Sequence, residues 1–394
     1  MTGQHRGGEH RLPEIFSSEM PPVRPRSRRR RVVLTVLTGT LILAAGAGVH
    51  TVASLQYDDS LVAFQDAGAI AGNRQTDLAS DSTDLAGAAA AASDMVAADT
   101  GTLMPADARQ DLDAAITEAA PTASEADAAT AASFPEPGTK PSWTWELFAE
   151  SARLADDTEA LHDQADDFEA LGDDVADAEL AVADTAVAAV RAASAAASDL
   201  EAAHVNARNP EIIAVRAAAE AAAGVAQLDA ETATRYAELE SAAAAMLESE
   251  QAELAEKAGP LYGSRVEIEA FARSLAPGVL LDFDWAPTVP GYDGSSYGGW
   301  TTWWYGDPGY STIALSDYIA ESWPAGWAKA LVAHEVGHAI SVKCEAKYDS
   351  SDQDTIEAWA TAWAISMGFN DRANGTDVYG APSQSMIDAA SSCR

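Results

Sequence analysis

The chain has 394 residues and carries 61 Asp and Glu against 24 Lys and Arg, a formal net charge of −37 at pH 7. Such an excess of acidic side chains repels phosphates, which argues against nucleic acid as a partner. The sequence contains no Gly-rich phosphate-binding loop and no Ser or Cys nucleophile constellation. A Rossmann-type domain therefore has no support.

The N-terminus has the pattern of a membrane anchor. Residues 1–31 contain eight Arg and three Glu, and residues 32–55 follow without a charged side chain. A helix needs about 20 apolar residues to cross a bilayer, and the positive-inside rule then makes residues 1–31 a cytoplasmic tail. We therefore expect a single-pass membrane protein whose chain from residue 56 onward lies outside the cell, at its surface. A cleaved signal peptide, with Ala-Gly-Ala at residues 45–47 as the cleavage site, is the alternative.

The segment that follows is rich in Ala, Asp and Glu and poor in aromatic residues. Over residues 56–142 we expect helices at 61–97 and 106–120. Residues 121–141 have the composition of a linker. Disorder of the whole segment is the alternative, because so little apolar surface is available to bury.

Residues 143–260 show a seven-residue repeat of apolar positions, which is typical of a coiled-coil seam. A helix break is expected at Asn209-Pro210, after which a weaker series continues to residue 246. Long helices joined by a short break predict an antiparallel coiled-coil stalk, through which chains could also self-associate. The first series consists of Leu147, Leu154, Leu161, Phe168, Val175 and Val182.

Residues 261–394 hold eight of the ten Trp and predict a small separate domain. Most of these Trp should fill its core, although Trp303 or Trp304 could wall a substrate pocket. A helix over about residues 324–342 and a second one downstream follow the strands. The fold class is therefore α+β, with a three-stranded antiparallel or mixed sheet after the long helices. The period-two pattern places the strands at 279–284, 300–305 and 310–315, the last two as a hairpin.

One pentapeptide of the 324–342 helix carries recognisable chemistry. His334-Glu335-Val336-Gly337-His338 matches H-E-x-x-H. Two His four residues apart project from one face of a helix and can share a metal ion, with Glu335 beside its open position. We expect His334 and His338 to bind Zn2+ and Glu335 to act as general base in the hydrolysis of peptide bonds.

Zinc bound by two His and a water lacks one protein ligand. Glu357 lies 19 residues after His338 (357 − 338) in a strongly helical segment. On these residues the C-terminal region resembles the gluzincin, or thermolysin-like, zinc metallopeptidases, whose third ligand is a Glu on a second helix at about this distance. The resemblance implies His334, His338 and Glu357 as ligands and a small zincin-like sheet that shelters them. Asp354 is the alternative third ligand.

Two positions depart from the pattern of that family. In thermolysin-like enzymes an Asp four residues after the Glu ligand orients the first His, and here that position is Thr361. The partner that orients His334 is therefore not assigned. No His follows His338 in the sequence, so a Tyr or Arg must stabilise the tetrahedral intermediate, and Tyr348 and Tyr379 are candidates.

The two cysteines of the chain need a separate explanation. The metzincin pattern would place a zinc ligand ten residues after the first His, where the chain has Cys344. Ser341, however, replaces the glycine that lets the metzincin chain turn back to the metal. A disulfide between Cys344 and Cys393 accounts for both cysteines of an extracellular chain. Closing a loop of this length would contribute about 4 kcal/mol in the loop-entropy model.

The resemblance also suggests how substrate binds. In such enzymes the strand before the motif helix lies at the sheet edge and pairs with an extended peptide. Plain core support is the alternative role of this strand. The substrate-binding residues predicted in this way are Thr312, Ile313, Ala314 and Leu315.

Together these features predict a membrane-anchored, extracytoplasmic zinc metallopeptidase that acts on a peptide or protein substrate. The alternative is a non-catalytic cell-surface interaction protein, whose coiled coil does the binding and whose C-terminal domain is a zinc-stabilised cap. The intact Glu335 favours the enzyme, because a structural zinc site has no use for a general base.

Overall fold

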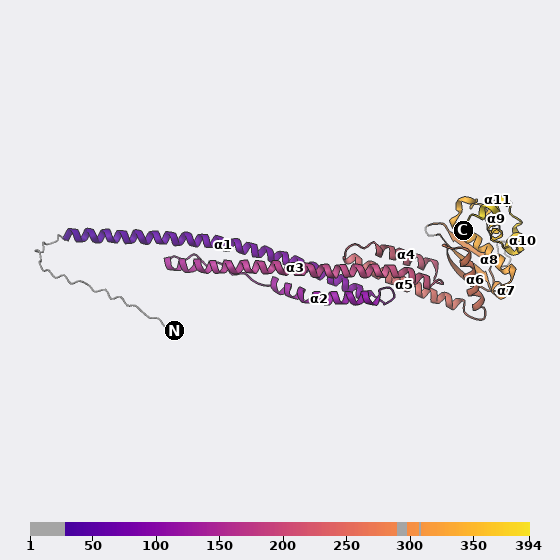
Figure 1. Cartoon of the computed structure of the whole chain (residues 1–394), viewed down its shortest axis with the longest axis horizontal. Helices are drawn as coiled ribbons and strands as arrows, with labels where there is room; N and C mark the ends of the chain where they lie inside the picture. Colours follow the sequence, from indigo (N-terminus) through magenta and orange to yellow (C-terminus); the bar gives the residue numbers. More distant parts are fainter. Residues whose placement is uncertain (1–27, 290–297, 307–308) are drawn as a thin grey trace, which may run out of the picture. The chain divides into compact units, whose positions relative to one another are not determined.

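The structure, a computed structural model, describes residues 28–289, 298–306 and 309–394, with side chains described from residue 46 onward. The predicted cytoplasmic tail lies outside the described residues up to residue 27, and so do the side chains of the predicted span up to residue 45. The described chain is mostly helical with one small mixed sheet, which confirms the α+β class (Figure 1).

Five long helices precede the sheet, and the chain forms two compact units. The first unit comprises the described residues up to residue 72 together with 133–165, and the second comprises 73–132 and the described residues from 166 onward. Two of the three boundaries cut through the long helices between residues 72 and 73 and between residues 165 and 166, whereas the third, between residues 132 and 133, lies in the predicted linker 121–141. The helices are α1 (Arg28–Ala98), α2 (Ala106–Thr130), α3 (Thr144–Ala203), α4 (Asn209–Ala223) and α5 (Ala230–Glu256).

Residues 57–142 are mainly helical, so the alternative of disorder is wrong. Helix α2 continues through Pro121 to Thr130, ten residues beyond the predicted helix end. The irregular stretch before α3 is therefore shorter than the predicted linker 121–141.

In the first unit the seam of α3 packs against α1. Leu147, Leu154 and Leu161 share one buried cluster with Tyr57 and Phe64. His50 of α1 lies beside Thr144, and Gly68 lies beside Leu161, so the two helices run in the same direction. The predicted antiparallel partner is therefore wrong for this part of the seam. Helix α1 also has a buried sevenfold series that the sequence analysis missed: Tyr57, Phe64, Ala71, Leu78, Leu85 and Ala92.

In the second unit the chain does fold back after α3. The Ser194 hydroxyl donates to the Ala219 carbonyl at 2.8 Å, and Arg191 donates to the Val225 carbonyl at 2.9 Å, so α4 runs antiparallel to α3. The segment after residue 209 is not one helix, however. It breaks between α4 and α5, where Asp229 caps α5 through a capping box.

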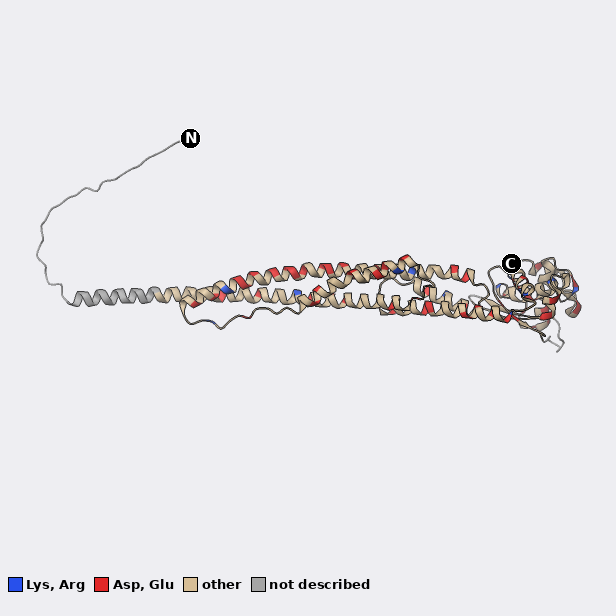
Figure 2. Ribbon diagram, turned by 90° about the horizontal axis from the view of Figure 1, so that it is seen from below, with Lys and Arg blue, Asp and Glu red and all other residues tan. Residues whose placement is uncertain are grey.

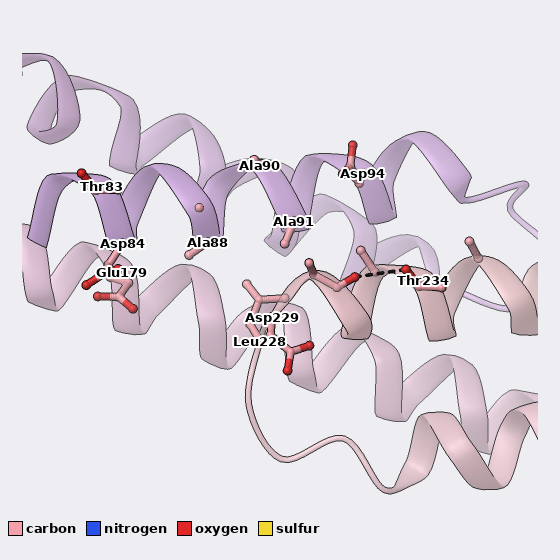
Figure 3. A pocket seen from close by; sticks show the side chains of 14 residues that line it. Thr83, Asp84, Ala88, Ala90, Ala91, Asp94, Glu179, Leu228, Asp229 and Thr234 are labelled. Atoms are coloured by element: carbon pink, nitrogen blue, oxygen red, sulfur yellow. Dashed lines mark hydrogen bonds between the residues drawn. The ribbon is translucent and has the colours of Figure 1, made fainter. Parts of the chain in front are cut away.

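Acidic residues recur along the long helices (Figure 2), whereas many of their buried positions are Ala. Between α1 and the start of α5 a cavity of about 580 Å³ remains, and six of its 14 lining residues are Ala, with the acids Asp84, Asp94, Glu179 and Asp229 (Figure 3). Because Ala side chains end at Cβ, facing helices with Ala at these positions do not fill the space between them.

One helix among the described residues, α3, is apolar enough to cross a membrane, with a mean hydropathy of 1.4 over 18 residues. Several of its small apolar residues, including Ala186, Val190, Ala193 and Ala197, are buried in the protein. About 39% of this apolar stretch is buried in the protein, and the membrane span at residues 32–55 stays a prediction.

The three predicted strands and the two helices that follow them are confirmed within a few residues. We call this C-terminal part, from residue 262, the head. Short 3₁₀ turns occupy residues 340–343, 345–347 and 372–374. Its other elements are α6 (Tyr262–Leu275), β1 (Leu280–Ala286), β2 (Gly299–Trp304), β3 (Tyr310–Ser316), α7 (Asp317–Ser322), α8 (Gly326–Ala339), α9 (Gln353–Ser366), α10 (Thr376–Tyr379) and α11 (Gln384–Ala390).

The order of the strands corrects one prediction. Strand β3 pairs in parallel with β1 on one side and antiparallel with β2 on the other, so it is the central strand. The backbone N–H and C=O groups of β3 are hydrogen-bonded to β1 on one side and to β2 on the other, so no row of unpaired groups is left to which a peptide could add as a further strand. The expectation that this strand lies at the sheet edge is therefore wrong, and with it the basis for assigning substrate binding to Thr312, Ile313, Ala314 and Leu315.

The predicted disulfide is confirmed. Cys344 and Cys393 are bonded, with their Cα atoms 6.1 Å apart, and both side chains belong to the core of the head. The bond joins the turn after α8 to the C-terminal end. Cys344 is thereby excluded as a metal ligand.

A buried polar network joins the head to the end of α5. The Lys257 ammonium contacts the Glu269 carboxylate at 2.7 Å, and both side chains are almost fully buried. Glu269 also accepts a hydrogen bond from the indole of Trp285, and Lys257 donates one to Asn206. The boundary predicted at residue 260 is therefore crossed by a buried ion pair.

Helix α4 makes a second connection to the head. The backbone N–H of Asn209 donates to the Asp282 carboxylate at 3.2 Å, and its side-chain amide donates to the Ser311 carbonyl at 2.9 Å. All three residues are buried. Strands β1 and β3 are therefore hydrogen-bonded to Asn209, a residue outside the predicted 261–394 domain.

Replacing Lys257 with Met should lower the free energy of unfolding by about 3 kcal/mol, because the charge of Glu269 would stay buried with only Arg273 to balance it. Denaturant titration of the full chain measures the change. Arg235→Met, which removes an exposed ion pair with Glu231, is the matched control and should change stability by less than about 0.5 kcal/mol. Equal effects of the two substitutions would contradict a structural role for the buried pair.

Candidate metal centre

Helices α8 and α9 bring the three predicted zinc ligands together because they pack unusually closely. A Cβ atom at Gly337 would lie 2.7 Å from the carbonyl oxygen of Ala360, so no side chain fits at this position. This approach places Glu357, on α9, across from His334 and His338, on α8. The glycine inside the H-E-x-x-H motif is thus the residue that lets the second helix reach the site.

The three ligand atoms converge on one point. The two Nε2 atoms of His334 and His338 lie 3.2 Å apart, and each lies 3.2 Å from Oε2 of Glu357. Ligand atoms at tetrahedral angles and about 2.0 Å from zinc are separated by roughly 3.3 Å. The triangle therefore has the size that a tetrahedral zinc ion requires, and all three residues are buried.

The hydrogen bonding of His334 leaves the ligand nitrogen free to bind a cation. Its Nδ1 lies 3.0 Å from the backbone carbonyl oxygen of Asn374. A carbonyl can only accept, so Nδ1 carries the proton and the Nε2 of a neutral ring presents a lone pair. That lone pair faces the Glu357 carboxylate, an arrangement that a shared cation stabilises.

Glu357 is held as a charged ligand. Burial would raise its pKa, but the contacts of the carboxylate with the imidazoles of His334 and His338 outweigh this effect and hold the pKa of Glu357 well below its usual range. Its second carboxylate oxygen accepts a hydrogen bond from the amide of Gln353 at 2.8 Å. Asp354, the alternative third ligand, is exposed in the first turn of α9 and does not belong to the cluster.

Glu335 lies next to the ligands without being one of them. Burial raises its pKa above the usual range, against the opposing effects of His334 and of a hydrogen bond from Thr301. The Thr301 hydroxyl donates to Oε2 of Glu335 at 2.7 Å. A carboxylate that is positioned in this way and has a raised pKa is suited to accept a proton.

Strand β2 covers this part of α8 with alternate residues. A Cβ atom at Gly299 would lie 2.6 Å from the side chain of Glu335, so the carboxylate occupies the space of the missing side chain. Thr301 follows two residues later, and Trp303 stacks on the His338 ring at 5.5 Å between centroids. Trp304 is exposed and stacks on Tyr310. Of the two Trp considered as a pocket wall, Trp303 is therefore the one at the site.

The partner that orients His334 is a backbone carbonyl, in place of the expected Asp side chain. Thr361 lies 3.4 Å from Nδ1 of His334 and donates to the backbone of Glu357. The shorter contact, to the Asn374 carbonyl, is held by a turn in which the Asn374 side chain accepts from the N–H of Thr376 at 3.0 Å. The Asn374-Gly375 dipeptide was the sequence signal for this turn, and it was missed.

Gly375 allows the turn to approach His334. Its φ angle is +101°, and an added Cβ would lie 2.3 Å from the Thr361 hydroxyl and 2.7 Å from Nδ1 of His334. Gly375→Ala should therefore displace the Asn374 carbonyl and weaken zinc binding about 10- to 100-fold.

Competition with a chromophoric chelator measures this change in zinc affinity. Gly368 is the matched control, because its φ is +93° but an added Cβ would meet nothing within 4 Å. Gly368→Ala should keep the zinc affinity of the parent chain. If Gly375→Ala also keeps it, the Asn374 carbonyl does not support the site.

The two Tyr candidates for stabilising the intermediate have different surroundings. Tyr379 stacks on the ring of His334, with centroids 5.8 Å apart and the planes 9° from parallel, and is partly exposed. Tyr348 instead stacks on Trp359, and its hydroxyl is hydrogen-bonded to that of Tyr305 at 2.8 Å. Tyr379 is therefore the candidate that the fold brings to the metal ligands.

No family model, curated protein or solved structure matches the chain. The functional argument therefore depends on the chemistry of the described residues alone.

Proposed function

We propose that the chain is a zinc-dependent metallopeptidase of the gluzincin type, with a zincin-like head on a coiled-coil stalk. We further propose that residues 32–55 anchor it in a membrane, with the N-terminus in the cytoplasm and the head outside the cell. One observation carries the proposal of hydrolysis. The Nε2 atoms of His334 and His338 and the Oε2 atom of Glu357 form a buried triangle with 3.2 Å sides, with Glu335 beside it.

Zinc bound there would supply a water with a pKa near 7 and a Lewis acid that polarises the scissile carbonyl. Glu335 then takes a proton from the attacking water and passes it to the leaving amine. Thr301 holds the Glu335 carboxylate in place during both transfers. Burial supports these steps, because charge interactions are stronger where water is excluded.

We assign substrate docking to β2 instead of β3. Strand β2 is an outer strand of the sheet and pairs only with β3 among the described residues. Its residues at positions 299, 301 and 303 contact Glu335 or His338. An extended peptide that adds to the free edge of β2 would therefore lie next to the catalytic groups.

The test uses the full chain, purified in detergent. Zinc content, and hydrolysis of a quenched fluorescent peptide library and of casein, are measured before and after treatment with a chelator. We expect about one zinc per chain, hydrolysis that stops on chelation, and recovery on adding zinc. Stoichiometric zinc without any hydrolysis would instead support the non-catalytic cap, and absence of zinc would refute both.

A further inference from the structure

Large apolar side chains are exposed at one end of the first unit. On α1 these are Val49, Val52 and Leu55, each more than half exposed. At the start of α3, Trp143 and Trp145 are 59% and 65% exposed, and Phe148 is 38% exposed. Exposing two neighbouring Trp side chains to water is unfavourable in free energy, which indicates that another surface covers them.

The two groups lie at the same level of the α1–α3 pair. The imidazole of His50, on α1, is hydrogen-bonded to the hydroxyl of Thr144 at 3.1 Å. Thr144 separates Trp143 from Trp145, whose rings stack with centroids 5.1 Å apart. The Trp pair therefore flanks the turn of α1 around residue 50.

This level coincides with the end of the uncharged segment of α1. Residue 50 lies 18 residues after residue 32 (50 − 32), or about 27 Å along a helix. The hydrocarbon core of a bilayer is about 30 Å thick. The Trp pair is thus at the depth where the hydrocarbon gives way to the headgroups, a zone in which Trp is enriched.

The charges of the first unit begin just beyond this level. From residue 32 to residue 57 the sequence has no Asp, Glu, Lys or Arg. Asp58 is the first charged residue of α1 after this segment, and it pairs with Lys140, three residues before Trp143. The uncharged segment of α1 therefore ends at the level where the nearest charged residue before α3, Lys140, also lies.

We propose that Trp143 and Trp145, together with Phe148 and the exposed face of α1 from Val49 to Leu55, form a second membrane contact. This contact seats the start of α3 among the lipid headgroups of the outer leaflet. A lipid surface is favoured over a second copy of the chain because the exposed face continues directly into the uncharged segment of the same helix. The inference uses the proposed membrane location but not the proposed hydrolysis.

The test reconstitutes the full chain in phosphatidylcholine vesicles with bromine placed either near the headgroup or near the end of the acyl chain. Bromine quenches Trp emission on contact, and eight of the ten Trp lie in the head. We expect the shallow bromine to quench about a fifth of the emission and the deep bromine much less, since interfacial Trp lie at headgroup level. Trp143→Ser combined with Trp145→Ser should abolish this quenching.

The matched control is Trp300→Ser combined with Trp304→Ser, which removes two exposed Trp of the head. In this control the shallow bromine should quench the same amount of Trp emission as in the parent chain. If the parent chain floats with the vesicles but is not quenched, the anchor stands and the Trp contact is refuted. A dimer in detergent that dissociates on removing Trp143 and Trp145 would also refute it, in favour of a second copy. Failure to float would remove both the anchor and the contact, whatever the peptidase activity.

Discussion

Replacing Glu335 with Gln should leave zinc bound and lower peptide hydrolysis by about 100- to 10 000-fold, the range that a positioned general base contributes. Gln has nearly the shape of Glu and can still accept the hydrogen bond from Thr301, but its amide cannot take a proton from water. Glu335 is not among the three converging ligands, so the metal should stay. The measurements are kcat/KM on a quenched fluorescent peptide and zinc content by atomic emission.

The control for this prediction is Glu345→Gln, which removes an exposed carboxylate in the turn after α8. It should hydrolyse the peptide at the rate of the parent chain. Loss of zinc together with activity in Glu335→Gln would show that Glu335 supports the metal instead of the proton transfer. Full activity would exclude it as the base.

Replacing Glu357 with Ala should abolish zinc binding. The change leaves two imidazoles, and zinc sites in proteins use at least three protein ligands as a rule. The cavity would also lose the negative charge that balances the ion. Zinc content after gel filtration should therefore fall from about one ion per chain to almost none, with loss of all hydrolysis.

Asp354→Ala is the matched control, since Asp354 is an acid on the same helix, one turn earlier, with an exposed side chain. It should keep both zinc and activity. If Glu357→Ala retains stoichiometric zinc, or if Asp354→Ala loses it, the assignment of the third ligand is wrong.

The centre of the candidate site could be predicted because its signals are local or nearly local. The spacing of His334 and His338 on one helix fixes their common face. Glu357 was found by its distance along the chain within a helical segment. The cysteine pair was predicted from the absence of any other partner for either residue in the sequence.

What was missed depends on contacts that have no such local signal. The strand order follows from the parallel pairing of β1 with β3, two strands that are not consecutive in the sequence. A period-two pattern indicates where a strand lies and which of its faces is buried, but it does not indicate which strands pair. The support of His334 is the backbone carbonyl of Asn374, and a carbonyl is present at every residue. The repeat of α1 was overlooked because Ala71 and Ala92 occupy seam positions in a chain full of alanine.

The polar network around Lys257 has a consequence for any soluble form of the protein. A protease that separated the head from the long helices by the shortest route would cut the turn around residues 258–261. Such a cut would take the ammonium group away from Glu269 and the backbone donor of Asn209 away from Asp282. A soluble fragment that stays folded must therefore include α4 and α5 with the head, so it has to begin far upstream of residue 262.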